Sequence, residues 1–324
     1  MTQIQASHTL ARQITEGKQI LSNRVHIVLI AIALAVAGVV AIAAQSSRSQ
    51  SQTPRQPSPV PPPSRVKDSP GSATRNELAT FAAAAERNAV LKTDLTWTFG
   101  GKVQHGWYLY DELIRRTLNT QKKSESADFA SALAAWQKKK GLNPNGVLDE
   151  DTFMALVSQW QNSRLKDRTP AQPDQLLTPS ASEFYDPERL AELRQVERET
   201  YTAYKQMIAA AIADPTLNLA HTSKAELTAT EKYFKVISAF RSREYQEELR
   251  RKSPNAGSAG LAVNSPHFTG RALDLYVGGD PVDTRDSNRA IQVKTSAYKW
   301  LVRNAERFGF RPYFYEPWHW EYVR

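Results

Sequence analysis

Residues 265–274 read Ser-Pro-His-Phe-Thr-Gly-Arg-Ala-Leu-Asp, and residues 316–322 read Glu-Pro-Trp-His-Trp-Glu-Tyr. Together they place His267, Asp274 and His319 in two short stretches near the end of the chain. On a helix, residues seven positions apart are displaced by roughly 10 Å along the axis, too far to share an ion easily. The proline and glycine of the first stretch instead predict a turn that returns its histidine over an aspartate on a strand.

These residue types suit a zinc site. Catalytic zinc takes three protein ligands about 2.0–2.2 Å away and keeps a fourth position for water. The chain has no cysteine, so histidine and carboxylate must supply the ligands. We therefore predict that His267, Asp274 and His319 bind Zn²⁺. Alone, a histidine and an aspartate seven residues apart are more often ordinary turn residues, so the prediction depends on the stretches occurring together.

Glu316 is the predicted general base. Zinc lowers the pKa of a water molecule that it binds to about 7, and a nearby carboxylate can take the proton and pass it to a leaving amine. Pro317 prevents a regular helix through this point, so Glu316 and His319 can point in different directions.

A third stretch, residues 239–246, reads Ala-Phe-Arg-Ser-Arg-Glu-Tyr-Gln, where a predicted strand meets a predicted helix. Arg241 can grip a carboxylate with two parallel hydrogen bonds, as a peptidase that acts at a chain terminus requires. The alternative is a structural ion pair with a helix carboxylate.

The three stretches resemble the zinc D-alanyl-D-alanine carboxypeptidase family of the VanY type, whose fold is shared with the Hedgehog signalling domain. The family's Ser-x-His-x-x-Gly-x-Ala-x-Asp and Glu-x-Trp-His-x-Glu-Tyr motifs match residues 265–274 and 316–322. Its Tyr-Arg-Ser-x-x-Tyr-Gln motif matches residues 240–246, with Phe240 in place of the tyrosine. The resemblance implies the zinc ligands and base given above. It also implies substrate contacts from Arg241, Gln246 and Ser265, although Ser265 has the alternative of stabilising a turn.

Residues 183–324 are predicted to form this zinc peptidase domain, an α+β fold with helices packed on an antiparallel sheet. The predicted helices are residues 187–212, 242–252 and 288–308, and the predicted strands are residues 233–240, 271–277 and 318–323. The expected activity is removal of a terminal D-amino acid from peptidoglycan stem peptides, with D,D and L,D specificity both open. An endopeptidase of the same fold and a non-catalytic, wall-binding zinc protein are the alternatives.

Residues 108–162 resemble the small all-α, three-helix peptidoglycan-binding module found beside many wall hydrolases. The pattern consists of Ala-Ala-Trp-Gln at 134–137, Gly-Leu at 141–142 and Gly-Val-Leu-Asp at 146–149, followed by a helix. Any small helical bundle with the same core spacing is the alternative. Residues 76–107, with a predicted helix at 76–91 and an aromatic hairpin at 95–110, have no assigned function. Residues 163–182 contain Thr-Pro and Gln-Pro steps and are predicted to be a linker.

Residues 25–44 form an apolar run of 20 in which His26 is the polar exception, long enough to cross a bilayer as a helix. We predict a single-pass anchor in the cytoplasmic (inner) membrane, with residues 1–24 cytoplasmic and the C-terminal domains on the periplasmic or extracellular side. A cleaved signal peptide and a buried core helix are the alternatives. Residues 45–75, rich in serine, glutamine and proline, are predicted to be a semi-rigid linker.

The net charge of +9 does not indicate a nucleic-acid partner. Residues 1–24 contribute +2 and residues 45–75 contribute +4, so most of the excess lies on the segments that flank the apolar run. A nucleic-acid-binding domain is instead expected to gather basic residues on one folded face. The predicted partners are therefore peptidoglycan and the membrane.

Overall fold

The computed structural model describes residues 70–252 and 262–323. The chain divides into two units, Met1–Ala79 and Thr80–Arg324. The predicted anchor, residues 25–44, lies outside the described residues, as do the predicted N-terminal tail and most of the proline-rich linker. Among the described helices, none is long and apolar enough to cross a membrane.

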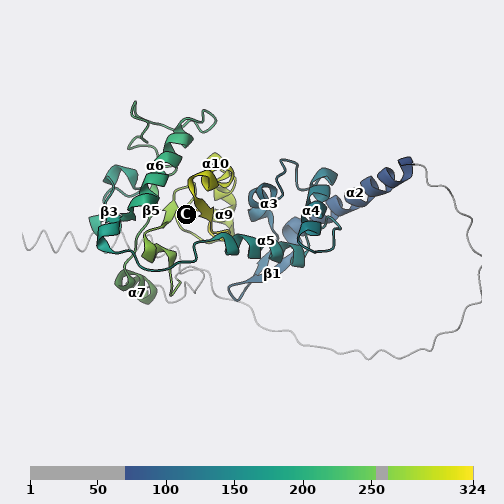
Figure 1. Cartoon of the computed structure of the whole chain (residues 1–324), viewed down its shortest axis with the longest axis horizontal. Helices are drawn as coiled ribbons and strands as arrows, with labels where there is room; N and C mark the ends of the chain where they lie inside the picture. The colour runs from purple at the N-terminus through teal and green to yellow at the C-terminus, as the bar shows by residue number, and fades with distance from the viewer. Residues whose placement is uncertain (1–69, 253–261, 324) are drawn as a thin grey trace, which may run out of the picture. The chain divides into compact units, whose positions relative to one another are not determined.

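The first half of the described chain is mainly helical, with one hairpin. Its elements are α2 (Pro70–Asp94), β1 (Thr96–Phe99), β2 (Lys102–His105), the 3-10 helix η1 (Tyr108–Tyr110), α3 (Asp111–Thr117), α4 (Ala127–Lys139) and α5 (Glu150–Ser163). The helix predicted at 76–91 and the aromatic hairpin are confirmed, and Gly100 and Gly101 form the hairpin turn with φ of 58° and 76°. Figure 1 shows α3, α4 and α5 lying together beside β1.

Two buried amide side chains fix the turn between α4 and α5. The Gln137 amide donates to the Val147 carbonyl at 3.0 Å and accepts from the Gly146 N–H at 2.8 Å. From α2, Asn88 donates to the Gly146 carbonyl at 2.9 Å and accepts from the Leu148 N–H at 2.7 Å. These bonds satisfy backbone groups that the turn would otherwise bury without partners.

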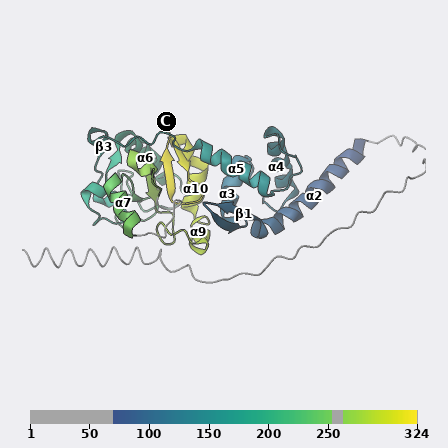
Figure 2. The same cartoon turned by 90° about the horizontal axis from the view of Figure 1, so that it is seen from below.

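The second half combines helices with a small sheet. Its elements are β3 (Leu176–Leu177), β4 (Val196–Glu197), α6 (Arg198–Ile212), β5 (Val236–Ser238), α7 (Arg243–Lys252), β6 (Ala272–Leu275), α9 (Asp286–Gln292), α10 (Ser296–Asn304), β7 (Phe310–Pro312) and β8 (His319–Tyr322). The four-stranded sheet has the order β5-β6-β8-β7, with antiparallel neighbours. Figures 1 and 2 show α9 and α10 beside this sheet. The prediction of an α+β arrangement is confirmed.

The predicted helix at 187–212 is wrong over residues 187–197, because α6 begins at Arg198. The Glu197 carboxylate accepts a hydrogen bond from the Thr200 N–H at 2.8 Å and so caps a new helix there. The preceding backbone pairs with β3 as strand β4, which takes its hydrogen bonds away from any helix.

The single helix predicted at 288–308 is also wrong. The predicted range covers most of α9, all of α10 and a final 3-10 turn, Ala305–Phe308, which are separate elements. The Thr295 hydroxyl accepts from the Tyr298 N–H at 3.1 Å, which starts α10 afresh. A capping residue inside the predicted range therefore divided the helix.

The strand predicted at 233–240 is shorter than expected. Phe234 has φ of 66°, a left-handed conformation that a continuous strand cannot contain, and β5 starts after it. The Phe234 ring is nevertheless fully buried and meets the Trp300 ring edge-on. The residue that interrupts the strand thus packs its side chain against α10.

Candidate metal centre

Strand register brings Asp274 and His319 together. In the β6–β8 pair Asp274 lies directly opposite His319, and in the β5–β6 pair Ser238 lies opposite Asp274. Side chains directly opposite each other in antiparallel strands have Cβ atoms about 4.5–5.5 Å apart on the same face. The two predicted metal ligands on strands are therefore neighbours, although 45 positions separate them in the sequence.

His267 approaches from the turn that precedes β6. A 3-10 turn, Pro266–Thr269, is capped by Ser265, whose hydroxyl accepts from the His267 N–H at 3.3 Å. Gly270 ends the turn with φ of 65°. The Nδ1 atom of His267 is 2.6 Å from the Ala239 carbonyl oxygen, which leaves Nε2 facing Asp274, 3.4 Å from its Oδ2.

The three side chains make one buried group. One ligand atom from each of His267, Asp274 and His319 lies within 4.8 Å of the others, and each residue is at most 3% exposed. Two imidazole nitrogens and one carboxylate oxygen are donors that zinc accepts. The group can therefore hold a metal ion.

Burial and neighbouring charges shift the pKa values of all three residues. Burial and the nearby Arg241 lower the pKa of His267 to about 4, so its ring is neutral at pH 7. Burial alone lowers the pKa of His319, but its hydrogen bonds to Asp274 and Glu321 outweigh burial and raise it to about 9. Burial opposes ionisation of Asp274, yet the two histidines hold its pKa well below the usual range. A metal ion at this group would have to displace the proton from the His319 ring.

Glu316 lies at the edge of this group, in the loop between β7 and β8. Its Oε2 is 4.0 Å from the Nδ1 of His319, and its side chain is 11% exposed. Burial raises the pKa of Glu316 to about 7. A carboxyl group with a pKa near the working pH suits proton transfer in both directions.

Arg241 lies on the other side of Asp274, after β5. It donates to Asp274 Oδ2 at 2.9 Å, to Ser238 Oγ at 3.1 Å and to Gln246 Oε1 at 3.4 Å. Gln246 is buried, and its amide also donates to the Ala262 carbonyl. The predicted substrate contacts thus make internal hydrogen bonds, and Ser265 has the turn-stabilising contact that the sequence left as its alternative.

A cavity of about 220 Å³ adjoins Arg241. Its lining residues are Pro170, Phe240, Arg241, Ser242, Arg243, Glu244 and Phe268. The Arg243 guanidinium lies 4.9 Å from the centre of the Phe268 ring. The cavity therefore combines aromatic walls with two guanidinium groups next to the candidate metal ligands.

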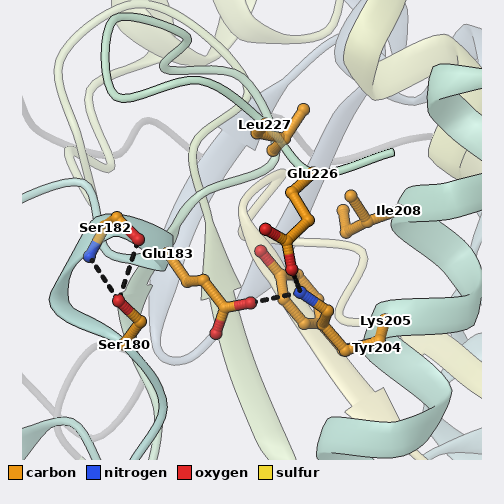
Figure 3. A pocket seen from close by; sticks show the side chains of 8 residues that line it. All are labelled: Ser180, Ser182, Glu183, Tyr204, Lys205, Ile208, Glu226 and Leu227. Atoms are coloured by element: carbon orange, nitrogen blue, oxygen red, sulfur yellow. Dashed lines mark hydrogen bonds and ion pairs between the residues drawn. The ribbon is translucent and has the colours of Figure 1, made fainter. Parts of the chain in front are cut away.

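A second cavity, of about 130 Å³, shares no residue with the metal centre (Figure 3). The figure shows Lys205 pointing toward two carboxylates, and its Nζ lies 2.5 Å from Glu183 and 3.5 Å from Glu226. These ion pairs neutralise the lysine, and we assign this cavity no catalytic role.

Sequence reasoning gave Glu321 no role, although it follows His319 by two positions. It is fully buried, and its Oε1 lies 3.2 Å from the Nε2 of His319. Alternate residues of a strand point to the same face, so a carboxylate behind a strand histidine could have been inferred from spacing alone. Arg164 and Arg168, which also reach Glu321, left no comparable signal.

A small antiparallel sheet that gathers two histidines and an aspartate beside a buried glutamate has the residues of a metal-dependent hydrolase. Comparison with known families supports a peptidase. Residues 193–324 match the family VanY, described as D-alanyl-D-alanine carboxypeptidase, and this segment of the chain belongs to that peptidase family. No curated protein matches the chain. The match does not include residues 108–162, whose resemblance to a peptidoglycan-binding module stays a prediction.

Proposed function

We propose that the VanY-family domain is a zinc-dependent D-alanyl-D-alanine carboxypeptidase that acts on the stem peptides of peptidoglycan. The observation that carries this proposal is the convergence of His267, Asp274 and His319 beside Glu316. We also propose that this domain has the fold shared by D,D-peptidases and the Hedgehog domain. Its small antiparallel sheet supports this fold.

The proposed reaction assigns a role to each group. His267, Asp274 and His319 would hold zinc, which when bound acts as a Lewis acid toward the scissile carbonyl and makes water a better nucleophile. Glu316 takes a proton from the attacking water as the water oxygen bonds to the carbonyl carbon. Glu316 then delivers that proton to the amine nitrogen as the C–N bond breaks. Its pKa of about 7 supports both transfers.

Arg241 is the proposed contact for the terminal carboxylate. Its hydrogen bonds with described residues use three of the five N–H groups of a guanidinium. Two N–H groups are left, and Arg241 lines a cavity whose walls include Phe240 and Phe268. A carboxylate on the guanidinium and a small apolar side chain against the rings suit a C-terminal alanine.

A peptidoglycan endopeptidase of the same fold is the second candidate. The observation that favours it is the 2.9 Å contact between Arg241 and Asp274. A guanidinium committed to a metal ligand is less available to select a free carboxylate, so an internal peptide bond would be accepted more readily.

We also propose that residues 25–44 anchor the chain in the cytoplasmic membrane, with the peptidase domain outside the cytoplasm. The length of the apolar run and the proline-rich segment after it support this topology. Cell fractionation tests it: the full-length chain should sediment with membranes, and deletion of residues 25–44 should release it. A full-length chain in the soluble fraction would contradict the anchor.

The activity test uses the full-length chain in detergent with defined substrates. These are a stem pentapeptide that ends in D-Ala-D-Ala, the tetrapeptide that ends in a single D-Ala, and a cross-linked dimer. Mass spectrometry identifies the products with zinc, with a chelator, and after zinc is restored. Release of one alanine from the pentapeptide, lost with chelator and regained with zinc, is the expected result. Cleavage confined to the dimer would instead establish the endopeptidase.

Variants assign the base. Glu316→Gln should abolish product release and still bind zinc, because its side chain is not among the three ligands. Glu192→Gln is the matched control, since Glu192 is exposed and outside the metal centre. Full activity in Glu316→Gln would show that Glu316 is not the base. If the wild-type chain cleaved none of the substrates, a non-catalytic wall-binding protein would be favoured.

A further inference from the structure

The carboxylate of Glu321 lies directly behind the candidate ligand His319. Both residues belong to β8 and are two positions apart, so their side chains share one face of the sheet. The Nδ1 of His319 is 2.9 Å from Asp274 Oδ1, whereas its Nε2 is 3.2 Å from Glu321 Oε1. A carboxylate on the far nitrogen of a metal-ligating histidine fixes the orientation of the ring.

Glu321 is held in turn by residues 164–168, which follow α5 and are called the exit segment. Arg164 donates to Oε1 of Glu321 from Nη2 at 2.5 Å and from Nε at 3.2 Å. The Leu165 N–H donates to Oε2 at 2.9 Å, and Arg168 Nη1 is 3.3 Å from Oε1. Because Glu321 is fully buried, these donors replace the water that its charge would otherwise bind.

The guanidinium of Arg164 is itself fixed in place. It lies 3.9 Å from the centre of the Tyr313 ring, and its Nη1 donates to Gln161 at the end of α5. A planar guanidinium can stack on a ring and bind a carboxylate at the same time, which a lysine ammonium cannot. The family match begins at residue 193, so the exit segment lies outside it.

We propose that the exit segment is part of the metal centre, with Arg164 as a positioning residue that acts through Glu321 on the ring of His319. This inference rests on the proposed function, because it takes His319 to be a zinc ligand. It makes zinc affinity depend on residues outside the family domain. The helical first half of the chain and the peptidase domain are then one functional unit.

The test measures the zinc affinity of the full-length chain by competition with a chromophoric chelator, and its thermal stability in the same buffer. Arg164→Gln should weaken zinc binding about 10- to 100-fold, the usual effect of losing an outer partner of a metal ligand. Arg164→Lys keeps the charge but loses the planar fork, so an intermediate loss is expected. If Arg164→Gln does not fold, the zinc affinity of Arg164→Lys decides the test.

Arg116→Gln is the matched control. Arg116 of α3 pairs with Glu306 at 3.1 Å and so also connects the helical half of the chain to the peptidase domain. Its partner is not in the metal centre, and wild-type zinc affinity is expected. If Arg116→Gln weakened zinc binding as much as Arg164→Gln, the effect would be general loosening of the chain and the inference would be overturned.

A double-variant cycle tests whether Arg164 acts through Glu321. Arg164→Gln, Glu321→Gln and the combined variant should lose affinity together, with the combined loss close to the larger single loss. Losses that multiply, or unchanged affinity in both Arg164 variants, overturn the inference and leave the proposed function intact. A wild-type chain that binds no zinc overturns the proposed function, and the inference with it.

Discussion

Gly270→Ala should destabilise the chain at the turn that carries His267. Gly270 has φ of 65°, and a Cβ atom there would lie 2.9 Å from the backbone nitrogen of Glu197 and 3.0 Å from Leu176 Cδ2. The backbone nitrogen cannot rotate away, because the Glu197 N–H donates to the Gly270 carbonyl at 3.1 Å. Relief must therefore come from movement of the turn itself.

The expected magnitude has two parts. A left-handed conformation costs a residue with a Cβ roughly 1–2 kcal/mol, which a loss of unfolded-chain entropy offsets by about 0.4–1 kcal/mol. Overpacking adds about 1–3 kcal/mol. Gly270→Ala should thus lower the free energy of unfolding by about 2–4 kcal/mol. Gly141→Ala is the matched control: its φ is 72°, but a Cβ there meets nothing within 4 Å, so only about 1 kcal/mol is expected.

Urea unfolding followed by tryptophan fluorescence measures both variants, because the chain has seven tryptophans. The shift in midpoint multiplied by the m-value gives the change in unfolding free energy. Equal losses in Gly270→Ala and Gly141→Ala would refute the argument, since the two sites share backbone conformation and differ in the space for a methyl group. A weaker zinc affinity in Gly270→Ala alone would follow from displacement of His267.

Three further predictions concern stability. Asn88→Ala leaves the buried Gly146 carbonyl and Leu148 N–H without partners, so the free energy of unfolding should fall by about 2–4 kcal/mol in urea titrations, and a loss below about 1 kcal/mol would contradict the role of Asn88. Tyr110→Phe removes the hydroxyl 2.5 Å from Nη2 of the buried Arg289, which should cost about 1–3 kcal/mol, whereas a neutral result would mean that the contact contributes nothing. Zinc at about 100 times its dissociation constant should stabilise the chain by about 2.7 kcal/mol, so a chelator should lower the melting temperature by roughly 5–11 °C in calorimetry; an unchanged melting temperature would count against the metal site.

Local patterns predicted much of the fold. The glycine pair at 100–101 predicted the hairpin, and the proline and glycine around His267 predicted a turn leading into a strand. Where a predicted helix was wrong, a local hydrogen bond had competed with periodicity, and where a predicted strand was too long, the left-handed backbone of Phe234 interrupted it. The cap at Thr295 divided one predicted helix.

The candidate site could be predicted as a set of residues but not as an arrangement. Short motifs and a family resemblance predicted the three ligand candidates. Nothing in their spacing reveals that Asp274 and His319 lie opposite each other in paired strands. Arg164 lies 157 positions from Glu321, and a lone arginine at the end of a helix has no sequence signature that distinguishes it from a solvated one. Contacts of this span follow only from the complete packing of the chain.

The direct opposition of Asp274 and His319 across β6 and β8 has a consequence for biosynthesis. In a newly made chain the candidate metal ligands are far apart along the unfolded backbone, so they can surround an ion only once the two strands have paired. If the chain crosses the membrane unfolded, cytoplasmic zinc cannot be carried along, and loading must draw on the pool outside. Binding of a metal would then be coupled to the pairing of β6 with β8.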